Sequence, residues 1–420
     1  MERSRPVLIA IAIGSAVYFL IAAFKNPRGD FINHYKFGLR FLSGEFLYDQ
    51  GLNIPYPPFW AMLFAPFSLL PPKIAMPLFV VIGLAALVML LRTLRNLTAG
   101  KLPGLGARFW VVTAVLVILS RFVLRDLADG GENILINALA WGGIYFFVKR
   151  RTLPGGALLG LAIALKCTPL LFAGYFVLKR QWAAAISTLT FAALFFVSPM
   201  LVQGPGWYGR NVSEWKRNLL LGISQEDPSI GVLGPDELGN KSLRPMLARY
   251  LMQLPAGRPG RFGGVAYIDF LRLPPQTANL IIKLVTLVSG VVIVWLFIRS
   301  PADVNASNFL WECAIINILM LLFSPITWGE HCVSLIPVLY LIGLRLTSGK
   351  DFPLWTKRVM AVVVFVLIIV NRSIIGFWLS ELAESYHVIT FCILALCAVA
   401  FAFWNEQRRA ASTIAAPSQA

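Results

Sequence analysis

The sequence contains 420 residues, of which 58% are hydrophobic and only 14% are charged, and its mean hydropathy is +0.72. Soluble domains carry about 25% charged residues, so this composition excludes an ordinary soluble protein. Its net charge of +17 lies mostly between long apolar runs, a distribution that indicates membrane topology rather than nucleic-acid binding. Because the runs are unbroken, they predict an all-α polytopic membrane protein and not a barrel.

A transmembrane helix needs about 20 apolar residues. The apolar runs predict about twelve crossings of the membrane. Two of them are the short segments of a hairpin at Gly155 to Leu178, which is interrupted at Lys166 to Pro169. The other predicted spans are Pro6 to Phe24, Ile74 to Leu91, Phe109 to Leu124, Ile134 to Val148, Trp182 to Val202, Thr277 to Ile298, Ser307 to Phe323, His331 to Leu344, Val359 to Val370 and Val388 to Trp404.

The basic residues between these spans can share one side of the membrane only if Gly155 to Leu178 crosses twice and Tyr56 to Leu70 does not cross by itself. The positive-inside rule then places both termini in the cytoplasm, with the tail 405–420. We expect a multi-pass protein of the cell inner (plasma) membrane, whose single domain is 1–420. A cleaved signal peptide is the alternative for the first apolar run.

Unusual polar residues gather on the expected outer face, in the first outer loop 25–56 and the long outer loop 203–276. Asp30 lies just beyond the first span, where a carboxylate can act as a general base for a substrate hydroxyl. His34 is one helical turn away if Asn33 to Leu42 is a helix. The alternative for Asp30 is an N-cap of that interfacial helix.

An ordered set of short motifs resembles glycosyltransferase family 87, of the GT-C class. The set comprises Asp30, Gly44 to Tyr48, Tyr56-Pro57-Pro58, Gly160 to Pro169, Asn240 to Leu243 and Ser324 to His331. The resemblance implies a GT-C-like bundle with an outer-face cavity and interfacial helices. It also implies one-step inverting transfer of a single sugar, with mannose expected, from a polyprenyl-phosphate donor to a lipid or glycan hydroxyl. By this resemblance Asp30 would be the catalytic base.

Two residues are candidates for binding the donor phosphate. Lys166 stands beside Thr168 and Pro169 within an apolar stretch, which is costly unless an anion offsets its charge; the alternative is a lysine that snorkels to the interface. His331 begins an apolar span, where it could donate to phosphate or sugar oxygens or simply bond to backbone. Glu330 occupies a place where family members often have a second His, so its role stays open.

The remaining candidates are weaker. Arg121 to Asn133 is rich in charged residues and is expected to be mostly a solvated loop, in which Arg125 or Glu132 could reach the sugar. In the long outer loop, Leu243 to Leu251 has the spacing of an amphipathic helix. Tyr56, Asn240, Ser242 and Arg244 are candidates for the acceptor or the donor, with a plain helix cap as the alternative for the last three.

No Asp-x-Asp pair accompanies Asp30 and no His/Cys cluster has metal-ligand spacing, so we expect no metal and no other cofactor. Expected partners are the lipid-linked donor, the acceptor and membrane lipids, with no nucleic acid. Two other functions fit a polytopic protein with a large outer loop. A lipid-linked saccharide transporter or flippase would need charged residues within its spans, and an oligosaccharide ligase or polymerase would depend on loop Arg and His residues.

Overall fold

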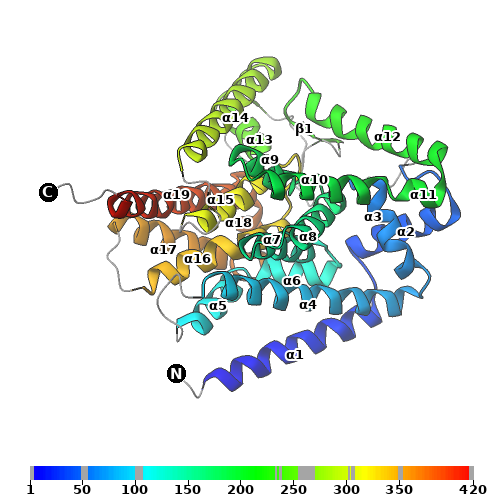
Figure 1. The fold of residues 1–420 in the computed structure, drawn as a ribbon, viewed down its shortest axis with the longest axis horizontal. Helices are drawn as coiled ribbons and strands as arrows, with labels where there is room; N and C mark the ends of the chain where they lie inside the picture. The colour runs from blue at the N-terminus through cyan, green and yellow to red at the C-terminus, as the bar shows by residue number, and fades with distance from the viewer. Residues whose placement is uncertain are drawn as a thin grey trace.

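In the computed structural model, the chain folds into packed helices with a short two-stranded ribbon (Figure 1). The structure describes residues 4–48, 55–99, 107–231, 234–235, 239–253, 270–300, 303, 308–348 and 353–415. Parts of the two expected outer loops, including 49–54 and 254–269, lie outside these residues.

In the described part of the first half of the chain, every secondary-structure element is a helix. Its elements are α1 (Ser4–Lys25), α2 (Asp30–Ser43), α3 (Pro58–Ser68), α4 (Pro72–Leu97), α5 (Ala107–Ile118), α6 (Ser120–Asp129), α7 (Asn133–Val148), α8 (Thr152–Leu165), α9 (Leu170–Leu178) and α10 (Trp182–Val197). The second half contains α11 (Pro199–Gln203), α12 (Pro205–Ser224), β1 (Ile230–Gly231), β2 (Gly234–Pro235), α13 (Leu243–Leu251), α14 (Pro275–Ile298), α15 (Phe309–Leu322), the 3₁₀ helix η1 (Glu330–Leu335), α16 (Ile336–Leu346), α17 (Leu354–Ile369), α18 (Arg372–Ser385) and α19 (Val388–Ala415).

Several of these helices suit a bilayer. Among the described residues, five helices are long and apolar enough to cross, or six if the pair α17 and α18, bent by 103°, counts as one span. Shorter apolar helices include α7, α8 and α15. The chain is therefore an all-α, multi-pass membrane protein, and the number of twelve crossings stays a prediction.

Two predicted segments differ in detail from the structure. The run Phe109 to Leu124 is not one helix, because the helix is interrupted at Leu119, between α5 and α6. The amphiphilic segment after the first span is helical from Asp30, three residues earlier than predicted. By contrast, the interruption in Gly155 to Leu178 is confirmed, since α8 ends at Leu165 and Lys166 is extended, with φ −151° and ψ 123°.

The helices around this break pack closely. α8 lies between α7 and α10, and a Cβ at Gly160 would come within 2.7 Å of the backbone nitrogen of Ala192, so small residues let the helices approach. Both termini lie at one end of the molecule, at the left of Figure 1, whereas α2 and α3 lie at the opposite end. The bundle thus holds the Lys166 break at a fixed place beside α2, α15 and η1.

Candidate functional site

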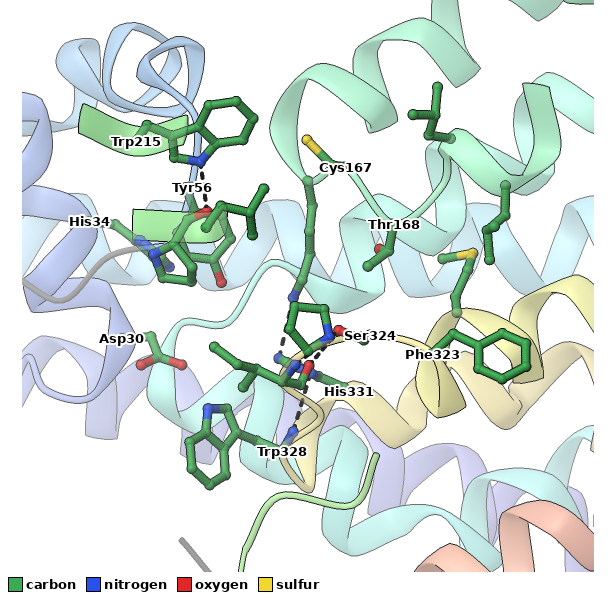
Figure 2. A pocket seen from close by; sticks show the side chains of 18 of the residues that line it. Asp30, His34, Tyr56, Cys167, Thr168, Trp215, Phe323, Ser324, Trp328 and His331 are labelled. Atoms are coloured by element: carbon green, nitrogen blue, oxygen red, sulfur yellow. Dashed lines mark hydrogen bonds between the residues drawn. The ribbon is translucent and has the colours of Figure 1, made fainter. Parts of the chain in front are cut away.

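A cavity of about 460 Å³ lies between these elements. One part of its wall is polar and comes from α2, the Tyr56 segment, the α8–α9 break and η1: Asp30, Asn33, His34, Tyr56, Lys166 and His331. Another part is apolar and includes Leu170, Leu171, Leu219, Met320 and Phe323. Asp30, Tyr56 and His331 line the cavity from three separate segments (Figure 2). In this view Phe323 lies on the far side of His331, away from Asp30. The three leading sequence candidates, Asp30, Lys166 and His331, therefore share one cavity.

Asp30 is the first residue of α2 and is partly buried. The N-cap position belongs to Gly29, whose φ of 68° favours glycine, and the cap has no side-chain hydrogen bond. The alternative that Asp30 is the N-cap is therefore wrong. Burial raises the pKa of the Asp30 carboxyl, and the negative charge of Glu132 raises it further, against the lowering effects of His34 and Lys166.

Glu132 lies behind the polar wall, in contact with Tyr56, Lys166 and His34, and is completely buried. Its Oε1 accepts hydrogen bonds from the Tyr56 hydroxyl at 2.7 Å and the Lys166 ammonium at 2.9 Å. Burial alone would raise the pKa of this carboxyl, but Lys166, His34 and Tyr56 outweigh burial and hold the pKa well below its usual range. Glu132 is therefore the ionised partner of Lys166.

The protonation of His34 follows from its neighbours. Its Nδ1 accepts a hydrogen bond of 2.8 Å from the indole N–H of Trp60, which can only donate. The ring proton therefore sits on Nε2, which lies 3.4 Å from Oε2 of Glu132. This arrangement matches a neutral imidazole to a carboxylate that can only accept.

His331 and Asn133 complete the surroundings of Lys166. The Lys166 Nζ lies 2.8 Å from Oδ1 of Asn133 and 3.2 Å from Nε2 of His331. The other ring nitrogen of His331 is 3.2 Å from the backbone nitrogen of Trp328. The cation is thus held by the carboxylate and the amide at the start of α7, beside Nε2 of His331, and Lys166 lines the cavity, where an anionic group could bind.

Comparison with known proteins identifies the family. The family model of glycosyltransferase family 87 matches residues 54–325, more than half of the chain. The chain belongs to glycosyltransferase family 87. It is therefore a glycosyltransferase, as the motifs predicted.

Mycobacterial family members resemble the chain over much of its length. It is 27% identical over 368 residues to a polyprenol-phosphate-mannose-dependent alpha-(1-2)-phosphatidylinositol mannoside mannosyltransferase of Mycobacterium tuberculosis, covering 80% of this chain and 75% of the relative. It is 28% identical over 296 residues to a pentamannoside mannosyltransferase of the same species, covering 69% of this chain and 58% of that relative. A pentamannoside mannosyltransferase of Mycolicibacterium smegmatis is 25% identical, covering 81% and 75%.

The candidate sugar-binding residues Arg125 and Glu330 lie near the cavity of this glycosyltransferase but do not line it. Arg125 is half-exposed, and its Nε lies 2.9 Å from Oε2 of the buried Glu330 and 3.6 Å from Oδ2 of Asp129. Burial raises the pKa of Glu330, while Arg125 opposes that rise. Neither Arg125 nor Glu330 is among the residues that line the cavity.

The helix predicted at Leu243 to Leu251 is confirmed as α13. Just before it, Asn240 ties the segment to the Ser324–Trp328 loop, because its Oδ1 accepts from the backbone of Thr327 at 2.9 Å and its Nδ2 donates to the Pro325 carbonyl at 3.1 Å. Ser242 is buried, and Arg244 donates to the carbonyl of Gln225 at 3.3 Å. None of the three lines the cavity, and of the three Asn240 is the one that holds the loop carrying Trp328.

The expectation that Arg121 to Asn133 is mostly a solvated loop is largely wrong. Most of this segment is α6, and Asp126, Glu132 and Asn133 are buried. Asn133 donates to Asp126, and Glu132 accepts from Tyr56 and Lys166, so their polar groups are satisfied within the protein. Sequence reasoning also missed Trp60 and Asn33, of which Asn33 lines the cavity one turn after Asp30. Only the helical spacing from Asp30 could have indicated Asn33.

Within the described ranges, no group of three or more His, Cys, Asp or Glu side chains could hold a metal ion. The expectation that no metal is required stays a prediction.

Proposed function

We propose that this protein transfers a single mannose from a polyprenyl-phosphate donor to the hydroxyl of a lipid or glycan, on the outer face of the plasma membrane and with one-step inversion. The observation that carries the proposal is the shared cavity of Asp30, Lys166 and His331. The names of the mycobacterial relatives support the donor, and make a phosphatidylinositol mannoside the first acceptor to test.

The proposed reaction needs a base and an anion-binding group at two places in one cavity. Asp30 removes the proton of the acceptor hydroxyl as the hydroxyl oxygen attacks the anomeric carbon of the donor sugar. The bond between that carbon and the phosphate oxygen breaks on the opposite face, and polyprenyl phosphate leaves with the electron pair. Lys166 and His331 stabilise the negative charge that grows on the phosphate.

The apolar wall supports a lipid-linked donor. Leu170 and Leu171 begin α9 directly after the Lys166 break, and both are more than 40% exposed, at 47% and 42%. With Phe323 and Met320 of the α15 region they extend the cavity away from the polar groups. A phosphate at Lys166 could therefore continue into an isoprenoid chain without leaving apolar surroundings.

The proposed orientation follows from the charges between spans and from the position of the termini. The basic segments point to the cytoplasm by the positive-inside rule. The termini lie at the end of the molecule opposite α2 (Figure 1), which supports an outer position for Asp30 and cytoplasmic termini.

The experiment uses purified protein in proteoliposomes with a panel of polyprenyl-phosphate sugars, and measures release of polyprenyl phosphate and glycosylation of the acceptor. We expect mannose to be the sugar released, and Asp30→Asn to abolish release while the protein stays folded. Glu214→Gln, on α12 outside the cavity lining and paired with the exposed Arg217, is the matched carboxylate control and should keep wild-type turnover. Near-normal turnover in Asp30→Asn would refute the mechanism, and movement of intact donor across the bilayer without bond formation would favour a flippase.

A further inference from the structure

The carboxylate of Asp126 connects the end of α6 to the start of α7. It is 1% exposed. Its Oδ2 accepts from the backbone N–H of Ile134 at 3.0 Å, and its Oδ1 accepts from the side-chain amide of Asn133 at 2.8 Å. An anion at the N-terminus of a helix is favourable, so the local role of Asp126 is to cap α7.

The same contact decides which way the Asn133 side chain faces. An ionised carboxylate has no hydrogen to donate, so only the NH₂ group of Asn133 can face Asp126. The carbonyl Oδ1 of Asn133 must then face the other way, where it lies 2.8 Å from Nζ of Lys166. With an amide in place of Asp126, either end of Asn133 could face residue 126, and the flipped rotamer would put an NH₂ group against the ammonium.

We propose that Asp126 is a positioning residue for Lys166: by fixing the amide of Asn133, it holds the ammonium where the donor phosphate binds. This rests on the function proposed above. Asp126 does not line the cavity and touches no substrate, so its effect on the donor passes through Asn133.

Gly131 offers a second way to disturb this arrangement without changing its chemistry. A Cβ on Gly131 would lie 2.3 Å from Oδ1 of Asp126, closer than side chains approach. Gly131→Ala should therefore displace the carboxylate from Asn133 without removing any ionisable group.

The test compares Asp126→Asn, Asn133→Leu and the double variant in detergent-solubilised protein. Burial raises the pKa of Asp126 to about 7, so the assay is run at about pH 8, where the carboxylate is ionised. The inhibition constant of polyprenyl phosphate and the KM for the donor are measured with kcat and the melting temperature.

We expect Asp126→Asn to raise the inhibition constant and the donor KM by about tenfold, with a smaller change in kcat. The double variant should be no worse than Asn133→Leu alone, because the two residues act in series. Gly131→Ala should shift the same constants in the same direction, and it decides the question if Asp126→Asn does not fold.

Asn371→Ala is the matched control for loss of a cap, because the Asn371 side chain accepts from the backbone of Ser373 at the start of α18. It should lower the melting temperature and leave the inhibition constant unchanged. Additive effects in the double variant, or an unchanged inhibition constant in folded Asp126→Asn and Gly131→Ala, would overturn the positioning role alone. A wild-type protein that neither binds polyprenyl phosphate nor transfers sugar from it would instead refute the proposed function, and this inference with it.

Discussion

Replacing Glu132 by Gln tests whether the polar wall depends on a carboxylate or only on its shape. The glutamine oxygen can still accept from Tyr56 and Lys166, as Oε1 does now at 2.7 and 2.9 Å. Its NH₂ group would then face Nε2 of His34, the nitrogen that carries the proton. His34 cannot move that proton to Nδ1, because Nδ1 accepts from Trp60. Two donors would therefore face each other in a buried site.

The magnitude follows from these contacts. A buried donor without an acceptor costs about 1–3 kcal/mol. Complete loss of a partner from a buried ion pair costs about 3–5 kcal/mol, but the glutamine oxygen keeps part of that contact with Lys166. We expect Glu132→Gln to lower the free energy of unfolding by about 2–4 kcal/mol.

The same change has a second signature in the pH profile. Asp30 must be ionised to accept a proton, and its raised pKa places the acid limb of kcat/KM above that of an ordinary carboxyl. The charge of Glu132 contributes to that rise, so Glu132→Gln should move the acid limb to lower pH.

Unfolding in detergent and kcat/KM against pH measure the two effects, and Glu214→Gln, which changes the partly exposed carboxylate paired with Arg217, is the control. The reasoning would be refuted if Glu132→Gln changed neither the free energy of unfolding nor the pH of the acid limb of kcat/KM.

Three further predictions concern packing, the bundle core and metals. Gly38→Ala should destabilise the protein by about 1–3 kcal/mol in thermal melts, because its Cβ would lie 2.2 Å from Oγ of Ser68; adding Ser68→Ala should recover part of the loss. Glu312→Leu should cost about 3–5 kcal/mol, since it leaves the buried ammonium of Lys179, now 3.0 Å away, without its carboxylate; transfer per folded molecule should persist. Treatment with EDTA should leave transfer unchanged, and a rate lost in chelator and restored by Mg²⁺ would contradict the metal-free mechanism.

The sequence was sufficient for the parts of the fold that depend on long apolar runs. It also predicted the break at Lys166, because Thr168 and Pro169 interrupt an apolar stretch, and α13, because its spacing is strictly helical. It did not predict the break at Leu119, since no glycine or proline marks it. Helix ends without such residues are decided by packing.

The sequence was enough to predict the main cavity residues, but not the roles of the buried carboxylates behind them. Asp30, Lys166 and His331 are predictable because each is unusual at its position and because the family motifs contain them. Glu132 and Asp126 are in a segment whose charged residues resemble a solvated loop, and only the tertiary structure buries them. Their partners, Lys166 and Asn133, come from a different helix or from beyond a turn, so no local pattern could show the pairing.

The two carboxylates of the site have opposite environments, and this difference assigns their roles. Glu132 is paired with Lys166 and its pKa is held low, whereas Asp30 has a raised pKa in the same cavity region. A carboxylate bound to an ammonium is a weak base, and one whose pKa is raised toward the working pH is a better one. If Asp30 were the partner of Lys166, it would lose this property, so in the proposed mechanism Glu132 would leave Lys166 to bind phosphate and Asp30 to remove the proton. Asp30→Asn should therefore abolish transfer, whereas Glu132→Gln should retain measurable turnover in the molecules that fold; the reverse order would assign the base to Glu132.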